Sequence, residues 1–281
     1  MKRFNGIALS VAFCSLASQA ALAQTKIDTL KVQNLNEVIV KGVRAAKEAP
    51  YAVANIRKSE LKQFSCSGQE LPFLLSRTPG ILAWSENGIG TGTTYMRIRG
   101  AAGSRINVTL DGVALNSPED QTVFWANMNS YSSLLGSIQV QRGVGSSTNG
   151  DGAFGGSISM ATAAPSLTPT AEVTGSFGSY NTYHTGASFS TGLLGKHLIF
   201  DGAYHETATD GYVDGTAGRS GSYYGGLTWL SDNFKVSYKN IGNFEKTGQA
   251  WNGVLGGDYN SNFTLLDDGI RTYKDMYKAG L

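Results

Sequence analysis

The sequence has little cysteine, little proline and no block of like charge. Its 281 residues include two cysteines and six prolines. Cys14 lies in an apolar stretch near the N-terminus, so a processed chain would keep only Cys66, which allows neither an internal disulfide nor a cysteine metal site. The formal net charge is +2 and 16% of the residues are charged. Without a basic block, nucleic-acid binding is excluded.

Long apolar runs are missing after the first residues. Lys2 and Arg3 precede the apolar stretch Ile7 to Ala17, and Ala21-Leu22-Ala23 has the small-residue pattern of a cleavage site. A membrane anchor would need about 20 mostly apolar residues, and polar side chains interrupt this stretch. We therefore predict a cleaved signal peptide at residues 1–23. No later apolar run reaches about 18 residues, so a mature chain that enters a membrane would do so as a β-barrel.

Residues suited to catalysis form no recognisable constellation. The histidines His184, His197 and His205 lack the spacing of metal ligands, and no serine or cysteine sits in a nucleophile elbow. Residues 150–155 match the dinucleotide fingerprint, but a strand pattern follows them where pyrophosphate binding needs a helix. We predict that the protein is not an enzyme and has no cofactor and no metal site.

Glycine is the residue present in excess, at 36 of 281 or about 13%, against about 7% in ordinary proteins. Many turns and few proline breaks favour a β-rich chain. Residues 51–165 predict a compact α+β domain. Its expected helices span Ser59–Phe64 and the stretch from about Pro72 to Arg77. Its expected strands are Thr94–Arg99, Asn107–Leu110, Ile138–Gln141 and Gly156–Thr162.

Residues 166–281 have a different texture, because short segments alternate between apolar and polar side chains with period two. The segments are Thr170–Phe177, Tyr183–Ser190, Leu198–His205, Ser222–Trp229 and Phe234–Lys239. A soluble β-sandwich alternates as well. Aromatic residues near the segment ends favour an outer-membrane barrel, as does the change between tight connections (192–196, 231–233) and long ones (208–219 and beyond 247).

Four motifs follow one another in a fixed order, and together they resemble the plug domain of TonB-dependent outer-membrane receptors. They are Met96–Gly100, Asn107–Val113, Ile138–Gly143 and Gly150–Ile158. Leu71–Gly80 is similar to the helix that precedes the first plug strands in this family. The resemblance is close over residues 35–165 and looser beyond. It implies an α+β plug domain followed by antiparallel transmembrane β-barrel strands, with the barrel incomplete in this chain.

A short β-branched segment precedes the α+β domain. From its residues alone, it is either an unpaired strand that can add to a partner chain or the first strand of the next domain. The resemblance identifies it as a TonB box within an arm at residues 24–50, and implies that the periplasmic energy transducer TonB pairs with it. The box residues are Glu37, Val38, Ile39 and Val40.

The resemblance also marks positions of the plug motifs: Arg97, Arg99, Gly100, Asp111, Gly112, Arg142, Gly143, Gly155 and Gly156. The family usually carries a glutamate where Gln139 stands, and that acid helps to pair the plug arginines. Taken alone, the arginines read as solvated strand charges. Inside a barrel we expect them to pair with inward acids such as Glu172 and Asp201, in contacts that specify position more than they stabilise.

The implied function is import across the outer membrane of a scarce ligand, held by the plug and the long loops and energised by TonB. The short arm before the box has no room for an additional N-terminal domain, which favours an iron chelate such as a siderophore or haem, with a vitamin as the next choice. The expected partners are TonB, outer-membrane lipid and this small ligand.

Two other classes stay open at this stage. A secreted β-rich adhesin or surface-binding protein would need no TonB, and a periplasmic enzyme lacks a residue set that could support it. Barrels of the plugged transporters have about 22 strands, and an open sheet edge cannot face lipid. Since residues 166–281 suffice for only about five strands, we expect a fragment of a longer gene product.

Overall fold

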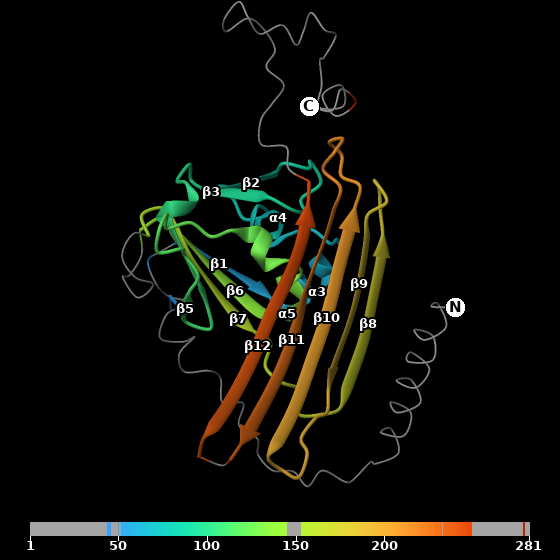
Figure 1. Cartoon of the computed structure of the whole chain (residues 1–281). Coiled ribbons are helices and arrows are strands. Elements are labelled where there is room, and N and C mark those ends of the chain that lie inside the picture. Colours follow the sequence, from blue (N-terminus) through green and yellow to red (C-terminus); the bar gives the residue numbers. More distant parts are fainter. Residues whose placement is uncertain are drawn as a thin grey trace, which may run out of the picture. The chain divides into compact units, whose positions relative to one another are not determined.

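Figure 1 shows the protein as a computed structural model, which describes residues 44–45, 50, 52–144, 153–231, 233–248 and 278. The chain separates into two units, Met1–Asn36 and Glu37–Leu281, and all described residues belong to the second. The predicted signal peptide, the predicted TonB box and the long connection expected after residue 247 lie outside the described residues, except for Gly248 and Lys278.

A central sheet organises the α+β domain. Its strand order is β1-β6-β7-β4-β5. The strands are β1 (Ala52–Arg57), β4 (Ile106–Leu110), β5 (Val113–Ala114), β6 (Leu135–Arg142) and β7 (Gly156–Thr162). β4 and β7 run parallel, and the other neighbours are antiparallel. Every residue of β7 is buried, as expected of a strand covered on both faces.

Short helices cover the apolar face of the central sheet. They are α3 (Lys58–Ser65), α4 (Leu71–Leu75) and α5 (Tyr131–Leu134), with 3-10 turns η1 (Gly103–Arg105) and η2 (Trp125–Met128). Leu61 and Phe64 of α3 share one core with Ile138 and Ile158 of the sheet. Pro72 occupies the first turn of α4, where its missing N–H breaks no helical bond. Both helices were therefore predicted close to their observed positions.

A hairpin of β2 (Ile81–Ser85) and β3 (Thr94–Ile98) forms a separate sheet above α4 in the view of Figure 1. The predicted strands of the α+β domain correspond to β3, β4, β6 and β7. Strands β1, β2 and β5 were not predicted. In β1 the burial does not alternate, so the pattern that marks a half-buried strand is missing there.

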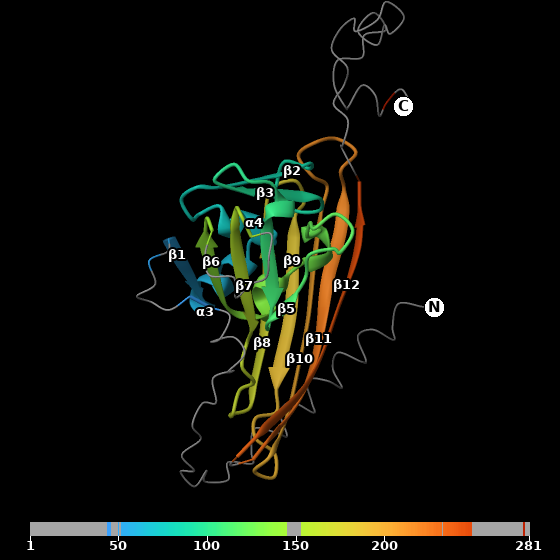
Figure 2. The same cartoon turned by 90° about the vertical axis from the view of Figure 1, so that its left-hand side faces the viewer.

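The second half of the chain forms an antiparallel meander in the order β12-β11-β10-β9-β8, here called the long sheet. Its strands are β8 (Thr170–Phe177), β9 (Tyr183–Ser190), β10 (Leu198–Thr209), β11 (Gly218–Leu230) and β12 (Lys235–Thr247). The long strands lie side by side in both views, with the α+β domain along one face (Figures 1 and 2). No helix among the described residues is long and apolar enough to cross a membrane.

The long sheet buries its polar face and exposes its apolar face. On β11, Ser222 is fully buried whereas the neighbouring Tyr223 is 50% exposed. Val173 and Tyr238 are exposed in the same way at 85% and 64%, while His205 and Thr228 are buried. A soluble sandwich would show the opposite arrangement. An apolar exterior around a polar interior is instead the pattern of a membrane barrel wall.

Three strands of the long sheet reach further than the sequence predicted. β10 continues to Thr209 and β11 begins at Gly218, so the connection expected at 208–219 shortens to 210–217. β12 likewise continues beyond Lys239 to Thr247. The alternation ended early in the sequence because the outward positions at these strand ends hold charged residues, among them Glu206 and Arg219, instead of apolar ones.

Candidate functional site

Asp111 ties the α+β domain to the long sheet. Its Oδ2 accepts a hydrogen bond from Lys239 Nζ of β12 at 2.8 Å. The backbone N–H of Thr162 donates to Oδ1 and the Thr162 hydroxyl to Oδ2, each at 2.8 Å. Burial opposes ionisation, but these bonds and the Lys239 charge outweigh it and hold the pKa of Asp111 below its usual value. This carboxylate is therefore a charged anchor between the two sheets.

The turn that carries Asp111 explains why glycine follows it. Asp111 and Gly112 connect β4 to β5 with φ angles of 49° and 85°. A two-residue hairpin with both φ values positive is a type I′ turn, which favours Asp-Gly. Arg99 and Gly100, with φ angles of 49° and 83°, close the loop between Ile98 and Ala101 in the same way. Both motif glycines thus serve turn geometry.

The other motif residues gather at the opposite end of β7. The N–H of Gly143 donates to the carbonyl of Gly155 at 2.9 Å, which joins the end of β6 to the start of β7. Arg142 Nη1 donates to the carbonyl of Pro79 at 2.7 Å, and a Cβ at Gly156 would collide with the Gln141 carbonyl. The residues gathered at this end are Arg99, Gly100, Arg142, Gly143, Gly155 and Gly156.

The expected pairing of the plug arginines with inward acids is wrong for Glu172. Its carboxylate accepts a hydrogen bond from Lys62 of α3 at 2.8 Å instead. β8 passes beside α3, where the hydroxyl of Ser176 also donates to the Cys66 carbonyl. Arg97, by contrast, lies over the Trp84 ring at 5.8 Å. No ion pair joins an arginine of the α+β domain to Glu172 or Asp201 among the described residues.

The pair of Lys62 and Glu172 is a weaker connection than the one at Asp111. Its side chains are 62% and 42% exposed, and solvent screens the attraction of an exposed ion pair. The side chains of Lys239 and Asp111 are only 19% and 24% exposed. The larger share of electrostatic attachment between the two sheets therefore lies at Asp111.

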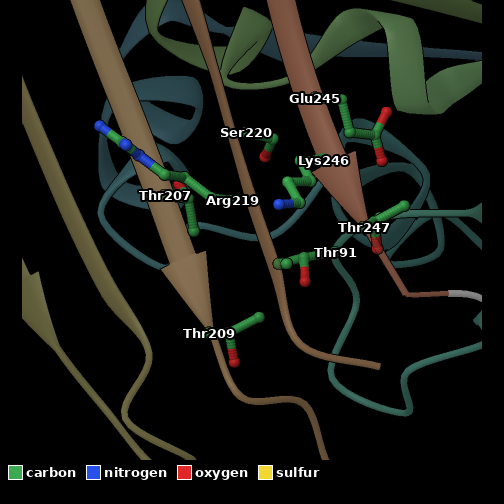
Figure 3. A pocket seen from close by; sticks show the side chains of 10 residues that line it. Thr91, Thr207, Thr209, Arg219, Ser220, Glu245, Lys246 and Thr247 are labelled. Carbon is green, nitrogen blue, oxygen red and sulfur yellow. The ribbon is translucent and has the colours of Figure 1, made fainter. Parts of the chain in front are cut away.

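A polar seam near the end of the long strands contains two carboxylates. Figure 3 shows Thr91 facing Thr209, Ser220 and Glu245 of β10 to β12 across a small pocket. Glu70, at the start of α4, is 3% exposed and accepts a hydrogen bond from the Thr94 hydroxyl at 2.7 Å. Within the described part of the chain, Oε1 of Glu70 and Oε1 of Glu245 have no hydrogen-bond partner.

Burial and the neighbouring Glu245 carboxylate raise the pKa of Glu70 well above its usual value, against the lowering effect of the Thr94 hydrogen bond. Folding therefore shifts Glu70 toward its neutral form relative to the unfolded chain. No local pattern in the sequence indicates this shift, because it depends on the burial of Glu70 and on Glu245, which lies far along the chain.

His184 and His205 line the buried face of the long sheet. Their rings stack with centroids 5.7 Å apart, and His184 Nδ1 lies 2.9 Å from the Thr207 hydroxyl. His197 lies apart from them and stacks on Trp229. The described residues contain no group of three or more His, Cys, Asp or Glu side chains that could hold a metal ion.

Gln139 contacts Ala45 and Asn55 rather than the motif arginines. Its amide oxygen accepts a hydrogen bond from the N–H of Ala45 at 2.8 Å, and its amide nitrogen donates to Asn55 Oδ1 at 3.0 Å. The position that departs from the family pattern thus holds the chain that enters the α+β domain.

Comparison with known proteins agrees with this architecture. Residues 45–157 match the family model described as TonB-dependent Receptor Plug Domain. The siderophore receptor PirA from Acinetobacter baumannii is 18% identical with a TM-score of 0.59, over 79% of this chain and 35% of PirA. The copper transporter OprC is 14% identical with a TM-score of 0.59, over 74% of this chain and 33% of OprC.

The pyoverdine-bound receptor FpvA from P. aeruginosa is 18% identical with a TM-score of 0.58, over 72% of this chain and 26% of FpvA. No curated protein matches the chain. The chain spans about a third or less of the length of these structures. At such low identity the likeness shows the fold.

The fold is that of a plug domain followed by antiparallel strands of a receptor barrel wall. Residues 45–157 thus match the plug domain of TonB-dependent receptors, and the described chain shares the fold of such receptors. From here on, the α+β domain is called the plug.

Proposed function

We propose that the protein acts in the outer membrane as a TonB-dependent receptor that imports a scarce ligand. The observation that carries this proposal is the inverted burial of the long sheet, with Tyr223 exposed, Ser222 buried and a plug anchored to the polar face through Asp111 and Lys239. A wall of this kind suits a lipid exterior and a polar lumen. The predicted signal peptide at residues 1–23 provides the export that this location requires.

The energy for import would come from TonB through the box at Glu37–Val40. An unpaired β-branched segment suits strand addition to a partner. The plug holds no nucleotide site by sequence, because the glycine-rich stretch at 150–155 leads into β7, which is a strand. We therefore assign a transport role without catalysis to the chain, in keeping with the similar structures, which are described as receptors and transporters.

The proposed ligand is an iron chelate, with a siderophore or haem as the first choice. Structures described as siderophore receptors share the fold, and so does a ferric yersiniabactin uptake receptor from Yersinia pestis. The copper transporter OprC shares it as well. The fold alone therefore does not determine the ligand. We expect the plug apex and the outer loops to select it.

Substitution of Val38 by proline tests the coupling role, because proline removes a backbone donor from the box. We expect uptake of a ferric siderophore to fall to the level of a strain without TonB, while binding of the same ligand to the cell surface persists. Unaltered uptake in the Val38→Pro variant would contradict the proposal. A mature chain that is secreted in soluble form would favour an adhesin instead.

A further inference from the structure

Arg44 is held on the polar face of the central sheet by a set of hydrogen bonds to two serines. Its Nη1 donates to the Ser137 hydroxyl at 2.9 Å and its Nη2 to the Ser159 carbonyl at the same distance. Nη2 also donates to the Ser137 carbonyl at 3.2 Å, and Nε to the Ser159 hydroxyl at 3.3 Å. The guanidinium thus bridges β6 and β7 with several bonds from one side chain.

Gln139 holds Ala45 beside Arg44. Its amide forms hydrogen bonds with both polar groups of the Ala45 backbone. The N–H of Ala45 donates to Oε1 at 2.8 Å, and Nε2 donates to the Ala45 carbonyl at 3.2 Å. This two-way pairing requires an amide, since a carboxylate has no donor for the carbonyl. Gln139 is 7% exposed, so loss of the pairing would leave buried polar atoms without partners.

The position of these contacts in the chain gives them a consequence for coupling. They lie a few residues after the proposed TonB box, and the next strand of the described chain begins at Ala52, where β1 pairs with β6. Val38 is six residues from Arg44 and fourteen from Ala52. At about 3.3–3.6 Å per residue, the maximal reach of Val38 from its attachment is about 20–22 Å in the first case and about 46–50 Å in the second.

We propose that Arg44, Ala45 and Gln139, with Ser137 and Ser159, form a latch that limits the reach of the TonB box. While the latch is closed, the box stays close to the plug sheet. When it opens, the reach more than doubles, and the first strand to bear load becomes β1. This inference rests on the proposed function only in giving the box its role, because the attachment itself is a property of the plug.

The latch lies on the same part of the plug as the anchor to the long sheet. Arg44 donates to Ser159 of β7, and Thr162 at the end of that strand donates to Asp111. Asp111 in turn pairs with Lys239. The Asp111 charge also acts favourably on the Arg44 guanidinium. Tension at the box would therefore reach β7 and its anchor before it reaches β1, as long as the latch is closed.

The test measures distance between spin labels at Val38→Cys and Lys58→Cys in the outer-membrane protein, in a Cys66→Ser background. Lys58 is exposed and adjoins Arg57, the register partner of Ser137 on β6. With the latch intact, we expect the distance between the two spin labels to have a short upper limit. In Arg44→Met and Gln139→Met we expect a population beyond that limit, extended by as much as about 26–29 Å for eight more residues of chain.

Superimposable distance distributions in the parent and in both variants would overturn the latch. Arg105→Met is the matched control, because Arg105 is an exposed arginine of η1 and its loss should leave the distances unchanged. Amide exchange of β6 and β7 verifies that each variant is folded. If Arg44→Met does not fold, Gln139→Met provides the test with a milder change. The measurement needs no TonB, so its outcome is independent of the uptake test with Val38→Pro.

Discussion

Asp111 Oδ2 and Lys239 Nζ lie 2.8 Å apart and join residues that are far separated in the sequence, one in a turn of the plug and one in β12. Thr162 completes the contact by donating to both oxygens of the carboxylate. The pair is mostly buried, so the loss of one charge would leave the other less well compensated. Plug movement relative to β12 must break this contact.

Replacement of Lys239 by methionine should loosen the plug by leaving the Asp111 carboxylate without its cation. Removing one partner of a buried ion pair costs about 3–5 kcal/mol, and the partial exposure of both side chains places this pair at or below the low end. Amide exchange of β4 and β7 in the membrane-embedded protein measures the change. Lys246→Met, an exposed lysine of the same strand, should have no such effect.

Acid should weaken the same anchor. The pKa of Asp111 is lower in the folded protein than its ordinary value of about 3.9, so the anchor contributes its full stability above that value. The contribution is lost as the pH falls through the lowered folded pKa. Plug unfolding followed between pH 7 and pH 3 should show this loss in the parent protein. Asp111→Asn should be less stable at pH 7, and the gap to the parent should close toward pH 3.

Glu70 should show the opposite dependence on pH. Its folded pKa is raised, so the free energy of unfolding falls as pH rises from the ordinary value of about 4.3 to the folded value. Glu70→Gln keeps an acceptor for Thr94 and removes the charge. We expect its melting temperature to exceed that of the parent by more at pH 8 than at pH 5. Glu119→Gln, at an exposed position, serves as the control. An equal difference in melting temperature between Glu70→Gln and the parent at both pH values would refute the raised pKa of Glu70.

Gly112→Ala should destabilise the plug because position 112 has a φ of 85° in the type I′ turn. A side chain in the left-handed region costs about 1–2 kcal/mol per residue. Gly103→Ala is a suitable comparison, since Gly103 lacks a positive φ and a Cβ there would meet nothing within 4 Å. Thermal unfolding of both variants should separate them by about that amount. Equal stability would show that the turn tolerates another conformation.

The order of plug elements and the alternation of the long strands were predictable because both depend on local patterns. The positions at which the strands end were not predictable in this way. Beyond His205 and before Ser222 the outward positions hold Glu206 and Arg219, which form two hydrogen bonds of 2.8 Å across the sheet. Apolar alternation does not mark a strand where the exposed face carries a charged pair. These strand ends were therefore predicted as part of a loop.

Contacts between distant segments were the other part that the sequence could not predict. Gln139 was singled out as a departure from the family, yet its partner Ala45 lies 94 positions away. Lys62 instead of an arginine pairs with Glu172, because α3 packs beside β8 in the folded protein. Residue type indicated that an inward acid would find a cation. Only the arrangement of the elements decides which cation is within reach.

The most direct test of TonB coupling is a cysteine cross-link in growing cells between Val38→Cys of the protein and a cysteine in TonB, with Cys66→Ser to remove the native thiol. We predict a disulfide-linked adduct at position 38 whose yield rises when ferric siderophore is added. Asp120→Cys, in an exposed loop of the plug, should give none. Absence of an adduct at position 38, or equal yield at both positions, would contradict the account.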